Sequence, residues 1–371
     1  MADYHGIIFA YSAAPEMGEL VRERTSASVP FCARYRLIDF SLSSLRNAGI
    51  RNAGVIMQRD YQSLMDHCAS GKAWDMTRKN GGLKLLPPFG LPEYHSGDYV
   101  GTMEALNAVS TYIEDIKEDN VILMQGNLCA NIDLEAAIAC HEQSGAAITA
   151  ICSPKAQGGV RYRYILNEDG NSSNRLLLNQ TEKGEGIASL EAYILSKELL
   201  LSMMKTKQQT NVYRFHAEAL FEYLNNGGKL NIYIHNGYAA FITTKGEYFK
   251  AATDILAPEN RRSVFPGDRP VRTSGLEGVS SYYGAEAKSR NCLVADNCII
   301  EGEIENCILH SGVRIAKGAK LKNCVLFRGT EVGENSELEC IVADKYVKFA
   351  PGTALKGSPK LPLVIPKGAE I

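Results

Sequence analysis

Apolar runs and helix-like segments alternate along the first two-thirds of the chain. They follow one another at Gly6–Phe9, Leu42–Asn47, Ala53–Met57, Tyr61–Cys68, Val121–Met124 and Ala147–Ile151. Continuous apolar runs bounded by polar turns are typical of strands that are buried on both faces. The alternation therefore predicts βαβ units, in which a mainly parallel sheet is covered on both faces by helices.

Two further segments carry helical signals. Leucine, valine and isoleucine recur with helical spacing in GTMEALNAVSTYI, which predicts a helix within Gly101–Ile113. Asp133 precedes a second apolar segment, Leu134–Cys140. Aspartate is a favoured N-cap because its carboxylate accepts a hydrogen bond from a free amide of the first turn, so a helix is expected to begin after Asp133.

Beyond about residue 280 the period of the apolar residues changes. They recur at steps of about five to six, with glycines between them. A meandering antiparallel sheet, the alternative fold, would alternate with period two. A period of six is the hexapeptide signature of a left-handed parallel β-helix. In that fold each short strand turns an aliphatic residue inward, and Gly, Asn or Asp takes the corner.

These patterns divide the chain into two domains. The segment at 257–270, APENRRSVFPGDRP, contains three prolines and mixed charge, which favours a connection between domains. We predict an α/β domain over residues 1–258, a linker over 259–280 and a β-helix over 281–371. The length of 371 residues suits two domains that each bury a core. The open end of the stacked coils also favours self-association.

The charge balance, apolar runs and cysteine spacing of the chain exclude several classes of function. The chain has 40 Lys and Arg against 42 Asp and Glu, a balance that provides no basic field for nucleic acid or anionic lipid. No run of about 18 apolar residues could span a bilayer, and the apolar start lacks the basic residues of a signal peptide, so a cytoplasmic location is expected. The ten cysteines include no C-x-x-C pair and the histidines have no metal-ligand spacing, so they predict no metal site.

Several long motifs give the sequence a family resemblance. The most specific are VPFCARYRLIDFSLSSLRNAGI at 29–50 and GKAWDMTRKNGGLKLLPP at 71–88, followed by GTMEAL, MQGNLCANIDL, IASLEAYIL and GYAAFITTKGEYFKAATDIL. In this order they resemble the motifs of the bacterial glucose-1-phosphate adenylyltransferase (ADP-glucose pyrophosphorylase) family, which makes ADP-glucose and diphosphate from ATP and glucose-1-phosphate. The resemblance implies a dinucleotide-binding-like nucleotidyltransferase domain joined to a left-handed β-helix.

The residues that this family uses for phosphate and metal are replaced. Ungapped alignment from the first long motif puts the Gly-rich phosphate loop on AYSAAPE at 10–16, where Glu16 replaces an arginine. A phosphate-binding lysine aligns with Ser26, and the two Mg²⁺-binding aspartates align with Asn127 and Phe241. The resemblance therefore implies no intact catalytic residue, no metal and no cofactor in this chain. The alternative is that loop insertions shift the register and leave intact groups nearby.

The family's sugar pocket is partly retained. Gly101 and Thr102 match its sugar-pocket turn, and Glu182 and Lys183 are candidates for its sugar-phosphate pair. Ser189 matches a pocket serine, but the glycine that follows in the family motif is Glu191 here. The resemblance therefore implies a degraded sugar pocket, because the larger side chain crowds the space that a sugar occupies.

Four arginines cluster in and just after the first long motif: Arg34, Arg36, Arg46 and Arg51. The resemblance places this region near the family's regulatory anion site, and Arg34 keeps the charge of a family lysine. Guanidinium groups bind anions with several N–H donors, so a sugar-phosphate or nucleotide effector is expected here. The alternative is that these arginines are solvated or pair with nearby acids.

Matched motifs with emptied active-site positions resemble the GlgD-type regulatory subunits of this family in Gram-positive bacteria. This implies a catalytically impaired subunit that modulates a catalytic GlgC-type partner in glycogen synthesis, as a heterotetramer in which Mg²⁺ belongs to the partner. One alternative is a stand-alone adenylyltransferase with a rearranged active site. Another is a hexapeptide acyltransferase, for which His310 is the one histidine of the expected β-helix.

Overall fold

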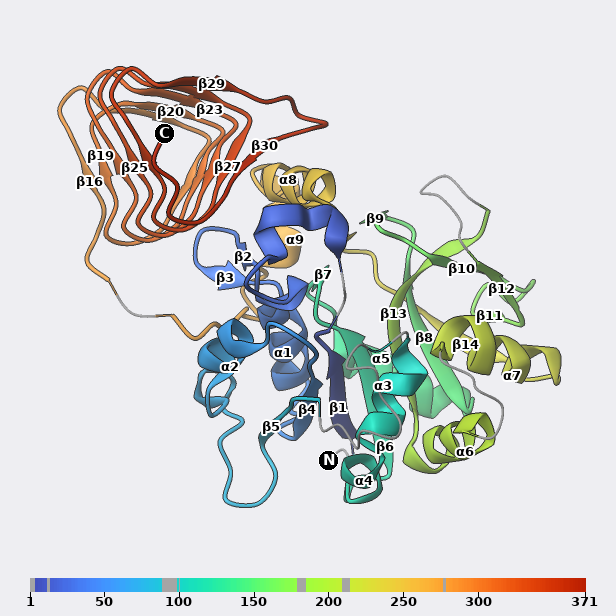
Figure 1. The fold of residues 1–371 in the computed structure, drawn as a ribbon. Coiled ribbons are helices and arrows are strands. Elements are labelled where there is room, and N and C mark those ends of the chain that lie inside the picture. The colour runs from blue at the N-terminus through green and yellow to red at the C-terminus, as the bar shows by residue number, and fades with distance from the viewer. Residues whose placement is uncertain are drawn as a thin grey trace.

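A computed structural model of the chain describes residues 4–11, 14–88, 99, 101–178, 185–208, 214–275 and 278–371. An α/β domain surrounds one large sheet, and a prism of stacked coils lies beside it (Figure 1). Within these ranges, no helix is both long and apolar enough to cross a bilayer.

The α/β domain is built on a sheet whose main path runs β11-β14-β8-β13-β6-β1-β4-β5. The strands around β1 pair in parallel, as predicted, whereas β13 runs antiparallel between β6 and β8. A second antiparallel pair, β10 and β12, extends from β13. The strand bounds are β1 Tyr4–Phe9, β4 Ala53–Ile56, β5 Leu83–Leu86, β6 Asn120–Gln125, β8 Ile148–Ser153, β10 Tyr162–Ile165, β11 Ser172–Ser173, β12 Arg175–Leu178, β13 Ile187–Ser196 and β14 Leu230–Ile234.

Helices bury both faces of this sheet. Successive side chains of a strand point to opposite faces, so Ile8 of β1 packs in one core cluster while Ile7 and Phe9 pack in the other. Helices α1 and α5 contribute to the first cluster, and α3 and α6 contribute to the second. The bounds are α1 Ile38–Asn47, α2 Gln62–Cys68, α3 Thr102–Ala108, α4 Ser110–Glu114, α5 Leu134–Ser144, α6 Lys197–Gln208, α7 Phe221–Asn225, α8 Lys245–Asp254 and α9 Pro258–Val264.

Three predicted segments can be compared with these bounds. Asp133 caps α5, since its carboxylate accepts a hydrogen bond from the Ala136 amide at 3.0 Å. The single helix expected within Gly101–Ile113 is two helices, α3 and α4, because Val109 leaves helical geometry at φ −116°. The predicted linker begins with a helix, α9, because proline fits the first turn of a helix, where its missing amide costs no bond.

The C-terminal domain consists of three parallel five-stranded sheets, as expected for the left-handed β-helix. Asn291, Asn306 and Asn323 occupy corners with φ near +52°, a backbone conformation that asparagine tolerates better than most residues. The strand bounds are β16 Tyr282–Tyr283, β17 Lys288–Arg290, β18 Leu293–Val294, β19 Ile299–Ile300, β20 Glu303–Glu305, β21 Ile308–Leu309, β22 Arg314–Ile315, β23 Lys320–Lys322, β24 Val325–Leu326, β25 Glu331–Val332, β26 Glu337–Glu339, β27 Ile341–Ala343, β28 Lys348–Phe349, β29 Ala354–Lys356 and β30 Leu363–Ile365.

One face of the β-helix packs against the α/β domain. Ile308 and Val325 share a hydrophobic cluster with Tyr248 of α8, and β27 and β30 lie next to α8 in the ribbon (Figure 1). Inside this interface the Arg24 guanidinium donates to both carboxylate oxygens of Asp344 at 2.8 and 3.0 Å. Both side chains are at most 4% exposed, so the pair is shielded from water.

We predict that Asp344→Ala lowers the free energy of unfolding by about 3–5 kcal/mol, because it leaves the Arg24 charge buried without a partner. Denaturant unfolding at neutral pH measures this loss. The matched control is Glu23→Ala, which removes the exposed ion pair with Lys367 at 2.7 Å and should cost less than about 1 kcal/mol. Equal losses for the two variants would contradict the assignment of the buried pair as the stronger contact.

Candidate functional site

The two positions that align with metal-binding aspartates lie side by side. Strand β7 (Leu128–Cys129) pairs with β15 (Ala239–Phe241), and Phe241 lies opposite Leu128. The Asn127 side-chain amide donates to the Ile242 carbonyl at 3.1 Å, and the Ile242 amide donates back to the Asn127 carbonyl at 3.2 Å. The structure therefore brings Asn127 and Phe241 together at a three-stranded sheet of order β7-β15-β9, in which β9 is Ala156–Gly158.

This pair of residues does not fit Mg²⁺. Magnesium is held by carboxylate, carbonyl and water oxygens in octahedral geometry, and phenylalanine offers no ligand atom. Asn127 is 4% exposed and its amide nitrogen is already bonded to the backbone, while Phe241 is 3% exposed within the core. Among the described residues, no three His, Cys, Asp or Glu side chains form a group that could hold a metal ion.

An aromatic cluster lies at the segment that aligns with the phosphate loop. Tyr11 contacts Phe9 and Tyr99 edge-on, with ring centroids 6.0 and 5.3 Å apart. Burial raises the pKa of the Tyr11 hydroxyl, and a hydrogen bond with Thr102 partly offsets that shift. The Thr102 hydroxyl, a predicted sugar contact, therefore interacts with a protein side chain.

The other two replaced phosphate positions differ in exposure. Glu16 lies exposed in the 3₁₀ segment η1 (Pro15–Val21), where a carboxylate repels phosphate. Ser26 is buried in the 3₁₀ turn η2 (Ser26–Ser28) and carries no charge. Neither residue supplies the cationic group that a triphosphate requires.

Residues predicted to line the sugar pocket make contacts within the protein. Gly101 precedes the first turn of α3 and has an extended conformation. The Ser189 hydroxyl lies 3.0 Å from the Tyr193 hydroxyl and accepts a hydrogen bond from the Glu191 amide at 3.0 Å. Glu182 and Lys183 lie outside the described residues.

Glu191 is a buried carboxyl group on an irregular stretch of β13. The register of β13 against β8 shifts between Ser189 and Ala192, and Glu191 has φ +49°, a conformation that suits the family's glycine better. Its side chain accepts a hydrogen bond from Gln125 at 3.2 Å. Burial raises the pKa of Glu191 to about 7.

Sequence reasoning missed one residue of this region, His216. Its ring stacks on Tyr162 with centroids 4.3 Å apart, and its Nε2 is buried without a hydrogen-bond partner in the part of the chain that the structure describes. Burial lowers the pKa of His216 to about 3, so the ring is neutral at physiological pH. No motif signals this contact, because the two residues are brought together only by the tertiary fold.

A basic pocket of about 320 Å³ lies between the two domains. Arg34 and Arg36, two of the arginines predicted to bind an effector, line it from the hairpin of β2 (Pro30–Phe31) and β3 (Tyr35–Arg36). Burial, with the nearby charges of Arg36 and Arg24, lowers the pKa of Lys345 to about 8. The full lining is Pro30, Ala33, Arg34, Tyr35, Arg36, His67, Ser274, Gly275, Ala295, Asp296, Asn297, His310, Ser311, Arg328 and Lys345.

Arg46 and Arg51 do not line this pocket. Both point to Asp75, at 3.3 and 3.8 Å, which is the ion pairing that the sequence left open as an alternative. Arg328 and Lys345 line the pocket in their place, and sequence reasoning missed both. They belong to a domain far along the chain, so only the packing of that domain brings them to the hairpin.

His310 also lines the basic pocket. It is 5% exposed, contacts Phe327 edge-on at 5.0 Å, and has an unpartnered Nε2 among the described contacts. Burial lowers its pKa to about 3. A catalytic histidine of a hexapeptide acyltransferase would protrude from a coil face, so this placement disfavours that alternative.

Comparisons with known proteins agree with this architecture. The nucleotidyl transferase family model matches residues 17–239, which is more than half of the chain, and the GlmU-like C-terminal hexapeptide model matches residues 278–359. The chain is 32% identical to the glycogen biosynthesis protein GlgD of Bacillus subtilis (strain 168) over 363 residues, covering 98% of this chain and 95% of the relative.

The chain belongs to the GlgD and glucose-1-phosphate adenylyltransferase family. It is 28% identical over 321 residues to the glucose-1-phosphate adenylyltransferase of Clostridium perfringens (strain 13 / Type A), covering 85% of this chain and 81% of the relative. It is 27% identical over 320 residues to that of Fusobacterium nucleatum, covering 85% and 83%. Membership in this glycogen-biosynthesis family confirms the resemblance that the motifs indicated.

We predict that Glu191→Gln removes a pH dependence of stability. The raised pKa means that protonated Glu191 stabilises the fold below about pH 4.5, and this contribution is lost as the pH rises to about 7. The wild-type chain should lose about 3 kcal/mol relative to the variant over that range, since one pKa unit corresponds to about 1.36 kcal/mol.

Denaturant unfolding of both proteins at a series of pH values measures the difference. The control is Glu185→Gln, which changes an exposed carboxyl group in the same segment and should shift stability by less than about 0.5 kcal/mol. Parallel pH profiles for wild type and Glu191→Gln would show that Glu191 titrates as an ordinary exposed carboxyl group.

Proposed function

We propose that this chain is a catalytically impaired, regulatory subunit of an ADP-glucose pyrophosphorylase that modulates a GlgC-type catalytic partner in glycogen biosynthesis. The observation that carries the proposal is the Asn127–Phe241 pair, in which one metal position is an amide bonded to the backbone and the other is a buried aromatic ring. Family motifs around both positions are retained, so the fold is kept while the metal chemistry is not.

Transfer of an adenylyl group depends on neutralising the charge that the phosphates carry in the transition state. In this chain Glu16 adds negative charge and Ser26 is neutral, while Asn127 and Phe241 replace two carboxylates that would hold Mg²⁺. An isolated loss could be offset by a neighbouring group, but these four changes all remove the same capacity. They support a role in which Mg²⁺ and turnover belong to the partner, within a heterotetramer.

The basic pocket supports a regulatory part of the same proposal. Arg34, Arg36, Arg328 and Lys345 converge from both domains, so an anion there would contact the two domains at once. An effector with phosphate groups suits this lining because guanidinium and ammonium groups make charge-assisted hydrogen bonds to phosphate oxygens. A sugar phosphate or a nucleotide meets that requirement.

The proposal predicts that the isolated chain forms no ADP-glucose above background from ATP, glucose-1-phosphate and Mg²⁺. Mixed at equal molarity with a GlgC-type enzyme, it should change that enzyme's rate or its substrate saturation curve. Diphosphate release, measured for each protein alone and for the mixture, separates the outcomes. Robust Mg²⁺-dependent turnover by the chain alone would instead favour a stand-alone adenylyltransferase with a rearranged site.

For the pocket, we predict that Lys345→Ala weakens binding of glucose 6-phosphate about tenfold or more, because a charge-assisted hydrogen bond contributes about 1.5–3 kcal/mol. Binding to the wild-type chain should also weaken as the pH rises through about 8, where the Lys345 amine loses its proton. Calorimetric titration measures both effects, with Arg46→Ala as a control that should bind like wild type. Unchanged affinity in Lys345→Ala would remove the pocket from the proposal.

A further inference from the structure

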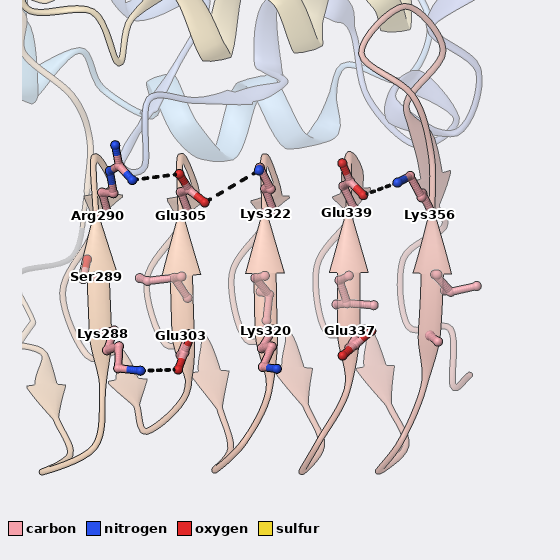
Figure 2. Close-up of a pocket in the computed structure, with 15 residues that line it drawn as sticks. Lys288, Ser289, Arg290, Glu303, Glu305, Lys320, Lys322, Glu337, Glu339 and Lys356 are labelled. Atoms are coloured by element: carbon pink, nitrogen blue, oxygen red, sulfur yellow. Dashed lines mark hydrogen bonds and ion pairs between the residues drawn. The ribbon is translucent and has the colours of Figure 1, made fainter.

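The three faces of the β-helix differ in what they present outward. The face made by β18, β21, β24, β27 and β30 is apolar and covered by the α/β domain. The face made by β17, β20, β23, β26 and β29, here called the charged face, carries two columns of side chains with a groove of about 710 Å³ along them (Figure 2). Its outward residues, from the first strand to the last, are Lys288 and Arg290, Glu303 and Glu305, Lys320 and Lys322, Glu337 and Glu339, and Ala354 and Lys356.

The sign of the charge alternates from strand to strand. The parallel register aligns Lys288 with Glu303, Glu303 with Lys320, and Lys320 with Glu337, and the second column follows the same order. Opposite charges on neighbouring strands stabilise a sheet, and like charges would destabilise it. The alternation therefore stabilises the stacked coils. It also gives the charged face a regular pattern of positive and negative stripes.

Ion pairs within the chain leave many charged groups of this face free to bind a partner. Lys288 binds Glu303 at 2.6 Å, but the two side chains remain 74% and 45% exposed. Lys320 and Glu337, in the middle of the face, have no ion-pair partner within 4.0 Å among the described residues. These two groups point outward without a dashed contact in the close-up (Figure 2). The face can therefore form further ion pairs.

We propose that the charged face docks onto the same face of a second copy of this chain. A two-fold axis parallel to the strands, placed between β20 and β23, reverses the order of the strands in the partner copy. Lys288 then faces Glu337 of the second copy, and Glu303 faces Lys320. In the other column Arg290 faces Glu339 and Glu305 faces Lys322, so every contact between these four strands joins opposite charges.

Charge also excludes the neighbouring registers. Moving the axis onto β20 or β23 places lysine over lysine and glutamate over glutamate, which is repulsive. An axis between β23 and β26, one full strand away from the proposed position, places Glu303 over Ala354 and loses that pair of opposite charges. The axis between β20 and β23 is therefore the register with the most opposite pairs. An isologous contact of this kind closes at two copies.

The proposed contact is small and polar, and these two properties determine its expected affinity and salt dependence. Four strands spaced about 4.8 Å apart and three residues wide cover far less than the roughly 800 Å² per partner of a standard interface. Exposed ion pairs are screened by salt, with a Debye length of about 10 Å at 0.1 M. We expect a weak dimer that forms at low ionic strength and dissociates as salt is added.

Sedimentation velocity of the full chain alone tests the inference. At about 20 mM salt and about 100 µM protein we expect a monomer–dimer equilibrium that shifts to monomer at about 0.5 M salt. Lys320→Glu and Glu303→Lys should each abolish the dimer, because each places like charges opposite one another across the axis. An equimolar mixture of the two variants should restore it, since the glutamates of one copy then face the lysines of the other.

The restoration in the mixture separates docking from misfolding, because two misfolded chains would not recover a dimer together. The matched control is Arg314→Glu on the face made by β16, β19, β22, β25 and β28, which should dimerise like wild type. A chain that stays monomeric at low salt, or a dimer that survives both single reversals, would overturn the inference. The test uses no catalytic partner, so its outcome is independent of the proposed function.

Discussion

The packing of one β-helix face against the α/β domain is the contact on which the rest of the structure depends. Outward aliphatic residues such as Ile308 and Val325 bury against α8, and the Arg24–Asp344 ion pair lies within the same interface. Apolar burial fixes the distance between the domains, and a buried ion pair fixes their orientation because its geometry is directional. This contact alone brings Arg328 and Lys345 to the hairpin that carries Arg34 and Arg36, so the basic pocket exists only when the domains are docked.

At the positions that align with the family's nucleotide site, several side chains make contacts within the protein. Where the family's metal site has two carboxylates, Asn127 offers an uncharged amide whose nitrogen donates to the backbone, and Phe241 is part of the core. Where a phosphate loop needs free amides, Tyr11 packs against Phe9 and Tyr99. These contacts within the protein support the proposed loss of catalytic function.

The sequence predicted the parts of the fold that depend on local pattern. Strand β1, the Asp133 cap and the hexapeptide coils follow from periodicity and from the hydrogen-bonding of single residues. The break at Val109 and the helix α9 were not predicted, because tertiary packing decides them. Among the site residues, alignment identified Asn127 and Phe241, whereas Arg328, Lys345 and His216 required the tertiary fold. Arg46 and Arg51 were also predicted to bind an effector, but in the structure they lie outside the basic pocket and pair with Asp75. The sequence did not reveal this partner because it is distant along the chain.

We propose that the nucleotide site of this chain no longer binds ATP with Mg²⁺. Calorimetric titration of ATP into the isolated chain, with Mg²⁺ in excess and a GlgC-type enzyme as the positive control, tests that claim most directly. We expect no Mg²⁺-dependent saturable heat from this chain under conditions in which the control enzyme binds, whereas ATP held at the basic pocket would bind without Mg²⁺ and would be weakened by Lys345→Ala. Saturable, Mg²⁺-dependent binding that is abolished by a substitution at Asn127 would contradict it.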